Sequence, residues 1–311
     1  MSNRVDLRDK FLGGMVGSAL GDAIGELAFR RPTKRSLLSE IEDRQTLVYT
    51  DDTAMAIGLA QSLVEVGGLD QQHLGDTFRA NYRREPWRGY ASGLPTVFSR
   101  VEREGMTYQE AARTLYGGEG SFGNGAAMRI APLGLLFHDA SNLYRKAELS
   151  AAVTHAHPLG IDGAAVQARA VAEAVCLDPE EPLSIDVFLG QLLDTARTSE
   201  MKHRVARVRE LVEMEVPPSR AAKELGQGVA VHRSLPFALY SFVRHPDSFA
   251  DCLFCAALNG GDRDTLGAMA CAVCGAYLGV EAIPPAWRER LENRDHIEEL
   301  AAGLSEMGQQ S

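Results

Sequence analysis

The segment from Phe11 to Phe29 reads FLGGMVGSALGDAIGELAF, and its glycines recur at helical spacing. A second segment rich in small residues, GAMACAVCGA, spans residues 267–276. Glycine in a helix costs about 1 kcal/mol relative to alanine. Because a residue without a side chain lets two backbones approach closely, we expect both segments to be central helices. This inference concerns packing and by itself indicates no chemistry.

The rest of the chain follows a helical pattern as well. Apolar residues recur at helical spacing over residues 185–196, and Thr107 with Glu110 forms a capping-box pattern. No segment shows sustained period-two alternation, and no internal repeat is present. We therefore predict an all-α fold that forms a single domain over residues 1–311 with a frayed tail from about residue 305.

Composition and charge narrow the function classes. The 311 residues are 45% hydrophobic and 24% charged, an ordinary globular balance that excludes long disorder. A net charge of −10 argues against general binding to nucleic acid or to acidic membranes. Asp22 and Glu26 interrupt the most apolar stretch, so we expect no membrane or secretory segment. Five cysteines, an odd number, are typical of reduced thiols, and we expect a cytoplasmic protein.

Two short acidic clusters are the sharpest chemical feature of the sequence. They read Thr50-Asp51-Asp52-Thr53 and Asp262-Arg263-Asp264-Thr265, and each begins an apolar helical segment. Asp and Thr are favoured helix caps, so capping alone is one interpretation. One cap needs only one side chain, however, and adjacent carboxylates repel unless a cation lies between them. Carboxylate and hydroxyl oxygens from two helix starts suit Mg²⁺ or Mn²⁺, as one ion or two.

A glycine-rich loop, GGEGSFGNG at residues 117–125, precedes another helical segment. Such a loop offers free backbone N–H groups to an anion. No Gly-Lys-Ser/Thr follows it, so it is not a Walker A loop. Met128 occupies the third glycine position of the dinucleotide pattern, which therefore also fails. Phosphate binding and an ordinary turn both remain open interpretations at this point.

Two further groups of residues carry competing interpretations. In the segment 154–158 (THAHP), a histidine could cap a helix or bind a ligand, and Pro158 predicts a helix boundary there. The pairs Cys252/Cys255 and Cys271/Cys274 are separated by fifteen residues, a spacing that resembles a zinc site. Their apolar, Ala-rich flanks favour buried core residues instead, with a zinc-stabilised helical binding module as the alternative.

Taken together and in order, these segments resemble the ADP-ribosylglycohydrolase family over nearly the whole chain. Within it, they look most like the branch that acts on serine-linked ADP-ribose and O-acetyl-ADP-ribose. The segments that carry the resemblance are 11–25, 49–53, Arg88-Gly89-Tyr90-Ala91-Ser92-Gly93, 120–129, Thr154-His155 with Leu159-Gly160, and 260–265.

The resemblance implies an all-α fold, a single compact multi-helix orthogonal bundle, with two Mg²⁺ ions at the bottom of an ADP-ribose cleft. Mn²⁺ would suit the same oxygen ligands. Matched by motif, the implied metal ligands are Thr50, Asp51, Asp52, Asp262, Asp264 and Thr265. The implied ADP-ribose contacts are Gly93, Tyr116, Ser121, Phe122, Gly123, Asn124 and His155. Tyr116 would lie against adenine and His155 near the distal ribose.

One position departs from the family pattern. The branch usually has a glutamate seven positions after the first Gly-Asp aspartate, and counting from Asp22 that position is Phe29. Glu26 is the nearby carboxylate, one helical turn from Asp22. Either Glu26 takes the role of this glutamate as acid/base, or the enzyme works without it. We predict Glu26, Asp262 and Asp264 as the catalytic residues, with Asp262 or Asp264 orienting the attacking water.

The sequence thus predicts a metal-dependent hydrolase that cleaves the bond between ADP-ribose and an O-linked acceptor: ADP-ribosylserine, O-acetyl-ADP-ribose or poly-ADP-ribose. The alternatives are an ADP-ribosylarginine hydrolase and an ADP-ribose-binding relative with weak catalysis. We expect the substrate to be an ADP-ribosylated protein. We expect a monomer without a nucleic-acid or membrane partner.

Overall fold

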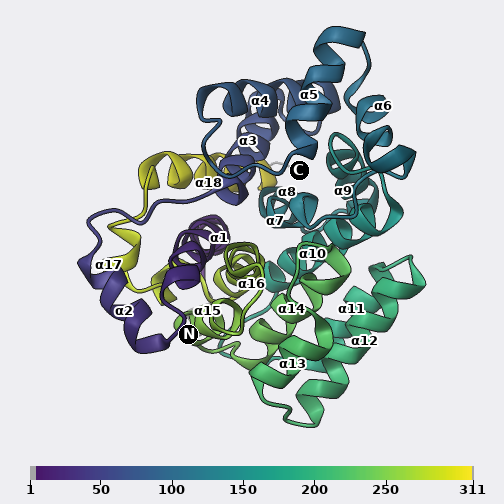
Figure 1. The fold of residues 1–311 in the computed structure, drawn as a ribbon. Helices are drawn as coiled ribbons and strands as arrows, with labels where there is room; N and C mark the ends of the chain where they lie inside the picture. Colours follow the sequence, from purple (N-terminus) through teal and green to yellow (C-terminus); the bar gives the residue numbers. More distant parts are fainter. Residues whose placement is uncertain (1–4, 310–311) are drawn as a thin grey trace.

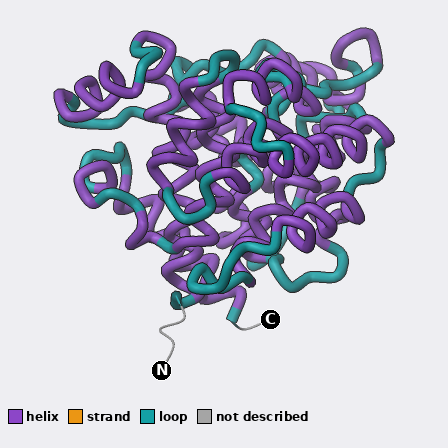
Figure 2. Tube along the Cα trace, turned by 90° about the horizontal axis from the view of Figure 1, so that it is seen from below, coloured by secondary structure: helices purple, strands orange, loops and turns teal. Residues whose placement is uncertain are grey.

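The computed structural model describes residues 5–309. These residues form 18 α-helices and three short 3₁₀-helices and contain no β-strand (Figures 1 and 2). The all-α prediction is therefore confirmed. The α-helices are α1 (Leu7–Arg30), α2 (Lys34–Asp43), α3 (Asp51–Val66), α4 (Gln71–Arg84), α5 (Gly93–Glu104), α6 (Tyr108–Arg113), α7 (Gly125–Met128), α8 (Ala131–Leu136), α9 (Leu143–Ala152), α10 (Pro158–Cys176), α11 (Ile185–Thr195), α12 (Ser199–Glu213), α13 (Pro218–Leu225), α14 (Leu235–Arg244), α15 (Phe249–Leu258), α16 (Arg263–Leu278), α17 (Pro285–Arg288) and α18 (Arg294–Gly308). The 3₁₀-helices are η1 (Leu115–Gly118), η2 (Val231–Arg233) and η3 (Val280–Ala282).

The two glycine-rich helices lie side by side in the middle of the molecule, as predicted (Figure 1). Helices α1 and α16 run antiparallel, and glycines make their contact surface. A Cβ added at Gly13 would lie 2.1 Å from the carbonyl oxygen of Gly275, and one at Gly21 would lie 2.2 Å from that of Gly267. Further along α1, a Cβ added at Gly25 would lie 2.5 Å from the carbonyl oxygen of Arg263. The middle of α1 is thereby brought beside the start of α16.

One apolar cluster includes buried residues from α1 through α18. The single-domain prediction stays a prediction, and this shared cluster is consistent with it. The frayed tail, by contrast, was predicted wrongly from residue 305. Helix α18 continues to Gly308 because Leu304 is fully buried and Ser305 is only 2% exposed. Residues 310–311 lie outside the described residues.

Several local predictions hold. Thr107 and Glu110 form the expected capping box at the start of α6. Residues 185–195 form α11, and its inward stripe is buried. None of the helices in the described part of the chain is long and apolar enough to cross a membrane.

Candidate active site

A cavity of about 270 Å³ opens where the starts of α3, α5, α7 and α16 meet. Its walls bring together predicted residues from distant parts of the sequence. Those that line it are Asp51, Asp52, Gly93, Tyr116, Ser121, Gly123, Asn124, His155, Asp262, Asp264 and Thr265. The predicted metal ligands and the predicted ADP-ribose contacts therefore face one shared space.

Three predicted residues do not line this cavity. Thr50 is the N-cap of α3, and its hydroxyl donates to Asp22. Phe122 lies on the outer side of the loop, 40% exposed, with its ring packed against His157. Glu26 is half-buried on α1, near enough to Asp264 that its charge contributes to raising the pKa of that carboxyl.

Asp22, which we had not assigned to the site, anchors it. This fully buried carboxylate accepts hydrogen bonds from the hydroxyls of Thr50 and Thr53, at 2.8 and 2.6 Å, and from both of their backbone amides. These bonds tie the first turn of α3 to the middle of α1, so Asp51 and Asp52 are held beside the central helix pair. The Gly21-Asp22 pair is the sequence signal, because a carboxylate within a glycine-rich buried helix needs such partners.

Three carboxyl groups at the cavity, those of Asp51, Asp52 and Asp264, have raised pKa values. Burial is the largest cause, followed by the neighbouring negative charges. The pKa of Asp51 is raised to about 7 by burial and then by the charge of Asp22. The pKa of Asp264 is raised to about 8 by burial and then by Asp262. Asp52, 2% exposed, has a pKa well above its ordinary value for the same reasons.

The interpretation that the two acidic clusters only cap helices is wrong for Thr50 and Asp262, the first residue of each cluster. Thr50 and Asp262 occupy the N-cap positions of α3 and α16, yet neither side chain accepts a capping hydrogen bond. Asp52 keeps its Oδ1 atom buried without any hydrogen-bond partner. A buried, unpartnered carboxylate oxygen is costly unless a cation or a proton satisfies it. The oxygen donor set therefore fits a hard divalent cation.

Within residues 5–309, no three His, Cys, Asp or Glu side chains form a group that could hold a metal ion as they stand. The carboxylates would have to draw closer together around a cation. They line an open cavity, which gives an ion access to them. The presence of Mg²⁺ or Mn²⁺ stays a prediction.

The zinc alternative fails on different grounds. Cys252, Cys255, Cys271 and Cys274 are at most 6% exposed and lie within α15 and α16. Burial raises the pKa of every one of these thiols. Among the described residues, the four cysteines form no group of three or more that could hold a metal ion. They are core residues, as their apolar flanks indicated.

The glycine-rich loop is joined to the second acidic cluster through one short backbone segment. The amide of Asn124 donates to the carbonyl of Val229 at 2.8 Å, and the amide of Asp262 donates to the carbonyl of Gln227 at 2.8 Å. Gly261 adopts a φ of +70°, and a Cβ there would lie 1.7 Å from the Gln227 carbonyl oxygen. Residues 227–229 therefore fix the loop and Asp262 relative to each other, which sequence spacing could not indicate.

The two histidines of the segment 154–158 have different roles. His157 is the N-cap of α10, and its ring nitrogen accepts a hydrogen bond from the amide of Leu159 at 3.1 Å. His155 lines the cavity beside the backbone of Gly123 and Gly125. The capping interpretation is thus correct for His157, whereas His155 faces the predicted ligand space.

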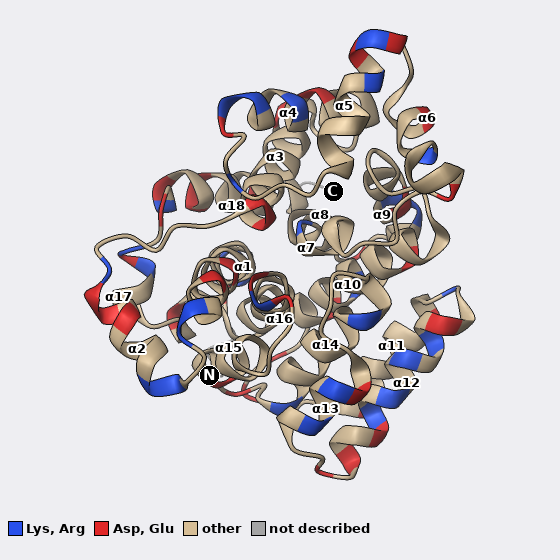
Figure 3. Cartoon of the chain, viewed as in Figure 1, with Lys and Arg blue, Asp and Glu red and all other residues tan. Residues whose placement is uncertain are grey.

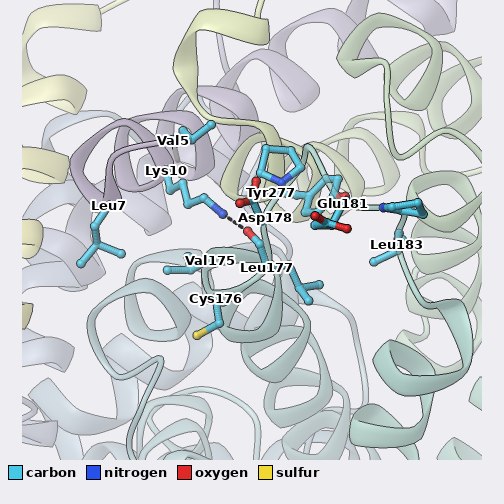
Figure 4. Close-up of a pocket in the computed structure, with 12 residues that line it drawn as sticks. Val5, Leu7, Lys10, Val175, Cys176, Leu177, Asp178, Glu181, Leu183 and Tyr277 are labelled. Carbon is cyan, nitrogen blue, oxygen red and sulfur yellow. Dashed lines mark hydrogen bonds between the residues drawn. The ribbon is translucent and has the colours of Figure 1, made fainter. Parts of the chain in front are cut away.

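A second cavity, of about 340 Å³, lies between the start of α1 and the end of α10 (Figure 4). Lys10 extends along its wall and donates hydrogen bonds to the carbonyl oxygens of Ala174 and Leu177. A lysine at this place satisfies carbonyls that the end of a helix leaves without partners. This cavity contains none of the predicted site residues, so we assign the Lys10 contacts to helix capping.

Charge is distributed unevenly over the molecule. Figure 3 shows both acidic and basic positions along α12 and α13, and acidic positions on the central helices α1 and α16. The central group includes Asp22 and Asp264, whose surroundings are described above. Acidic residues thus gather at the candidate site as well as on the outer helices.

Comparison with known proteins identifies the family of this chain. The family model for ADP-ribosylglycohydrolase matches residues 3–311. A solved structure described as an ADP-ribosylglycohydrolase-related protein complex superposes with a TM-score of 0.73 at 27% sequence identity, covering 97% of this chain and 99% of the other. The chain belongs to the ADP-ribosylglycohydrolase family, whose members are hydrolases of ADP-ribosyl linkages.

Two curated relatives indicate the branch of the family that this chain resembles. ADP-ribosylhydrolase ARH3 of Mus musculus is 33% identical over 346 residues, covering 97% of this chain and 92% of its own length. ADP-ribosylhydrolase ARH3 of Homo sapiens is 32% identical, covering 97% and 94%. The resemblance to this branch of the family is therefore confirmed.

Proposed function

We propose that this protein is a Mg²⁺-dependent hydrolase that releases ADP-ribose from an O-linked acceptor on a protein. The observation that carries the proposal is the shared cavity: carboxyl groups from the starts of α3 and α16 line it together with the glycine-rich loop. The unpartnered Oδ1 of Asp52 supports a cation at the carboxylate side.

The side chains that would hold Mg²⁺ are those of the two acidic clusters: Thr50, Asp51, Asp52, Asp262, Asp264 and Thr265. When bound, Mg²⁺ supplies Lewis acidity that orients ribose oxygens and stabilises negative charge on the leaving oxygen. Thr50 would need to turn its hydroxyl away from Asp22, which now accepts it at 2.8 Å.

The other roles in bond cleavage belong to side chains and backbone groups of the protein itself. Cleavage at the anomeric carbon passes through an oxocarbenium-like state, so positive charge develops on the ribose. The carboxyl groups of Asp262 and Asp264 lie at the cavity wall, where they can orient the attacking water. The backbone of the loop at Ser121–Asn124 would anchor the diphosphate, so that binding far from the bond positions the reacting carbon.

Glu26 is our candidate for the acid/base group. It lies one turn beyond Asp22 on α1 and acts electrostatically on Asp264. The side chain of Phe29, at the position where the branch usually has glutamate, is 48% exposed and has no ionisable group. Among these two residues only Glu26 can move a proton.

The substrate is proposed from the branch. The curated relatives are named ADP-ribosylhydrolase ARH3, and the segments 88–93 and 120–125 resemble the branch that acts on serine-linked ADP-ribose. The segment 88–93 is anchored at its first residue, because Arg88 forms ion pairs with Glu85 and Glu292. Gly89, Ala91 and Gly93 then line the cavity.

Asparagine substitutions test the metal-dependent part of the proposal. Asp262→Asn and Asp264→Asn should each lower kcat/KM for ADP-ribose release at least about a hundredfold and weaken Mg²⁺ activation. Asp43→Asn, an exposed position at the end of α2, is the matched control and should leave both unchanged. Turnover that is indifferent to EDTA and to both substitutions would contradict the proposal.

A further inference from the structure

Arg129 is fully buried in the wall of the candidate active site and has no carboxylate partner among the described residues. Its guanidinium donates to the carbonyl oxygens of Gly125 and Ser150, at 3.1 and 3.3 Å, and to the hydroxyl oxygen of Thr154 at 2.8 Å. Burial lowers the pKa of Arg129 to about 9, so it stays charged at neutral pH. A guanidinium can only donate hydrogen bonds.

The Thr154 hydroxyl connects this cation to His155. Its oxygen accepts the bond from Arg129 and lies 2.8 Å from Nδ1 of His155. A hydroxyl has a single proton to donate. Thr154 is 3% exposed, and Nδ1 is the one acceptor within its reach among the described residues. The hydroxyl proton therefore points to Nδ1, which must be unprotonated to accept it.

The other edge of the imidazole faces the ligand space. A Cβ added at Gly125 would lie 3.2 Å from Nε2 of His155, and one added at Gly123 would lie 3.6 Å away. Nε2 has no hydrogen-bond partner among the described residues, and the ring lines the cavity together with both glycines. A neutral imidazole whose Nδ1 accepts a bond carries its proton on Nε2.

We propose that Arg129 and Thr154 act as positioning residues that hold His155 as the neutral Nε2–H tautomer, so that His155 donates a hydrogen bond to an oxygen of the bound ligand. The nearby positive charge of Arg129 disfavours an imidazolium at this place. Burial, followed by that charge, lowers the pKa of His155 to about 3.

This inference rests on the proposed function, because it takes an ADP-ribose oxygen as the acceptor. It also assigns His155 a definite chemical role. A ring whose Nε2 carries a proton cannot accept one from water, so His155 binds and does not act as the general base. A ribose hydroxyl oxygen or a phosphate oxygen would satisfy the donor, whereas an N–H group would not.

The tautomer can be measured in the free protein without substrate or metal. The protein is labelled with ¹⁵N-histidine, and long-range ¹H–¹⁵N spectra are recorded at neutral pH. His155→Asn identifies the signals of His155 among those of the eight histidines. We expect an unprotonated Nδ1 and a protonated Nε2. A protonated Nδ1, alone or in an imidazolium, would overturn the proposal.

A matched pair of variants tests the role of the hydroxyl. Thr154→Val keeps the shape but removes the hydroxyl, and Thr154→Ser keeps the hydroxyl. ADP-ribose affinity, measured by titration calorimetry in EDTA, should fall about tenfold in Thr154→Val and by less than about twofold in Thr154→Ser. The Thr154→Val spectrum should show both tautomers. Equal affinity of Thr154→Val and wild type, or an equal loss in both variants, would contradict the proposal.

Arg129→Met removes the donor that orients Thr154 and should also give both tautomers. If this buried substitution prevents folding, the comparison of Thr154→Val with Thr154→Ser tests the proposal without it. Neither the spectrum nor the calorimetry involves turnover. A protein that shows the Nε2–H tautomer and the Thr154 effect but hydrolyses nothing would refute the proposed function and leave this inference standing.

Discussion

Nδ2 of Asn124 donates a hydrogen bond to Oδ2 of Asp262 over 2.6 Å. This contact joins the glycine-rich loop to the second acidic cluster, residues that are 138 positions apart in the chain. Asn124 is 6% exposed, and its backbone amide is held by Val229. The position of the predicted diphosphate loop is thus coupled directly to a predicted catalytic carboxylate.

Replacing Asn124 should therefore affect catalysis more than folding. Hydrogen bonds to charged groups contribute about 1.5–3 kcal/mol, so Asn124→Ala should lower kcat/KM roughly ten- to a hundredfold. Asn124→Asp should lower it further, because a second carboxylate would face Asp262. Steady-state kinetics of ADP-ribose release measure both, with the exposed Asn142→Asp as the control. Equal activity of Asn124→Asp and Asn124→Ala would argue against this coupling.

The contact between α1 and α16 predicts opposite effects for two glycine-to-alanine substitutions. Gly21→Ala places a Cβ against the carbonyl of Gly267, so it should destabilise the fold by at least about 1–3 kcal/mol. Gly190→Ala in α11 meets open space and should stabilise by about 0.5–1 kcal/mol. Urea denaturation gives both values. A stabilising Gly21→Ala would show that these helices do not need their close approach.

The raised pKa values predict how the metal-free protein responds to pH. The folded protein keeps Asp51 protonated to about pH 7 and Asp264 to about pH 8, whereas the unfolded chain loses both protons near pH 4. The folded state binds more protons in this interval, so stability falls as the pH rises through it. Between about pH 6.5 and 8.5 we expect a loss of order 1–2 kcal/mol in EDTA.

Thermal unfolding at several pH values tests this dependence. The variant with Asp51→Asn and Asp264→Asn should show a flatter profile, because the titrating groups are gone. Excess Mg²⁺ should raise the Tm of the wild type more at the alkaline end, where the carboxylates are ionised. A metal-free Tm that rises over this interval, or a Mg²⁺ effect independent of pH, would be inconsistent with the acidic site.

Glu26 should carry proton transfer. Glu26→Gln preserves its size and should reduce kcat about 10²- to 10⁴-fold while changing ADP-ribose affinity little. Phe29→Glu in that background asks whether a carboxylate at the family's usual position restores turnover. Single-turnover rates and equilibrium binding separate the two effects. A Glu26→Gln enzyme with wild-type kcat would remove Glu26 from the mechanism.

Much of the fold was predictable because its signals are local. Helical spacing and caps depend on residues a few positions apart, and the capping box at Thr107 formed as expected. The glycine spacing also identified the central pair. The end of α18 was not predictable in this way, since Ser305 is polar but is covered by residues from elsewhere in the fold.

The sequence predicted the chemical types of the site residues better than their arrangement in space. The clusters and the loop indicated their chemistry, but their meeting depends on long-range contacts. Asp22 was not assigned to the site, although it holds the start of α3 in place. Arg129 lay within a noted segment without a role, because nothing local shows that a cation is fully buried beneath His155.

The most direct measurement compares release of free ADP-ribose from serine-linked and arginine-linked peptides, side by side, with Mg²⁺ and with EDTA. The account predicts release from the serine peptide with Mg²⁺, and none from it in EDTA or from the arginine peptide. Release from the arginine peptide alone would contradict the O-linked assignment. Undiminished release in EDTA would contradict the metal-dependent site formed by the two acidic clusters.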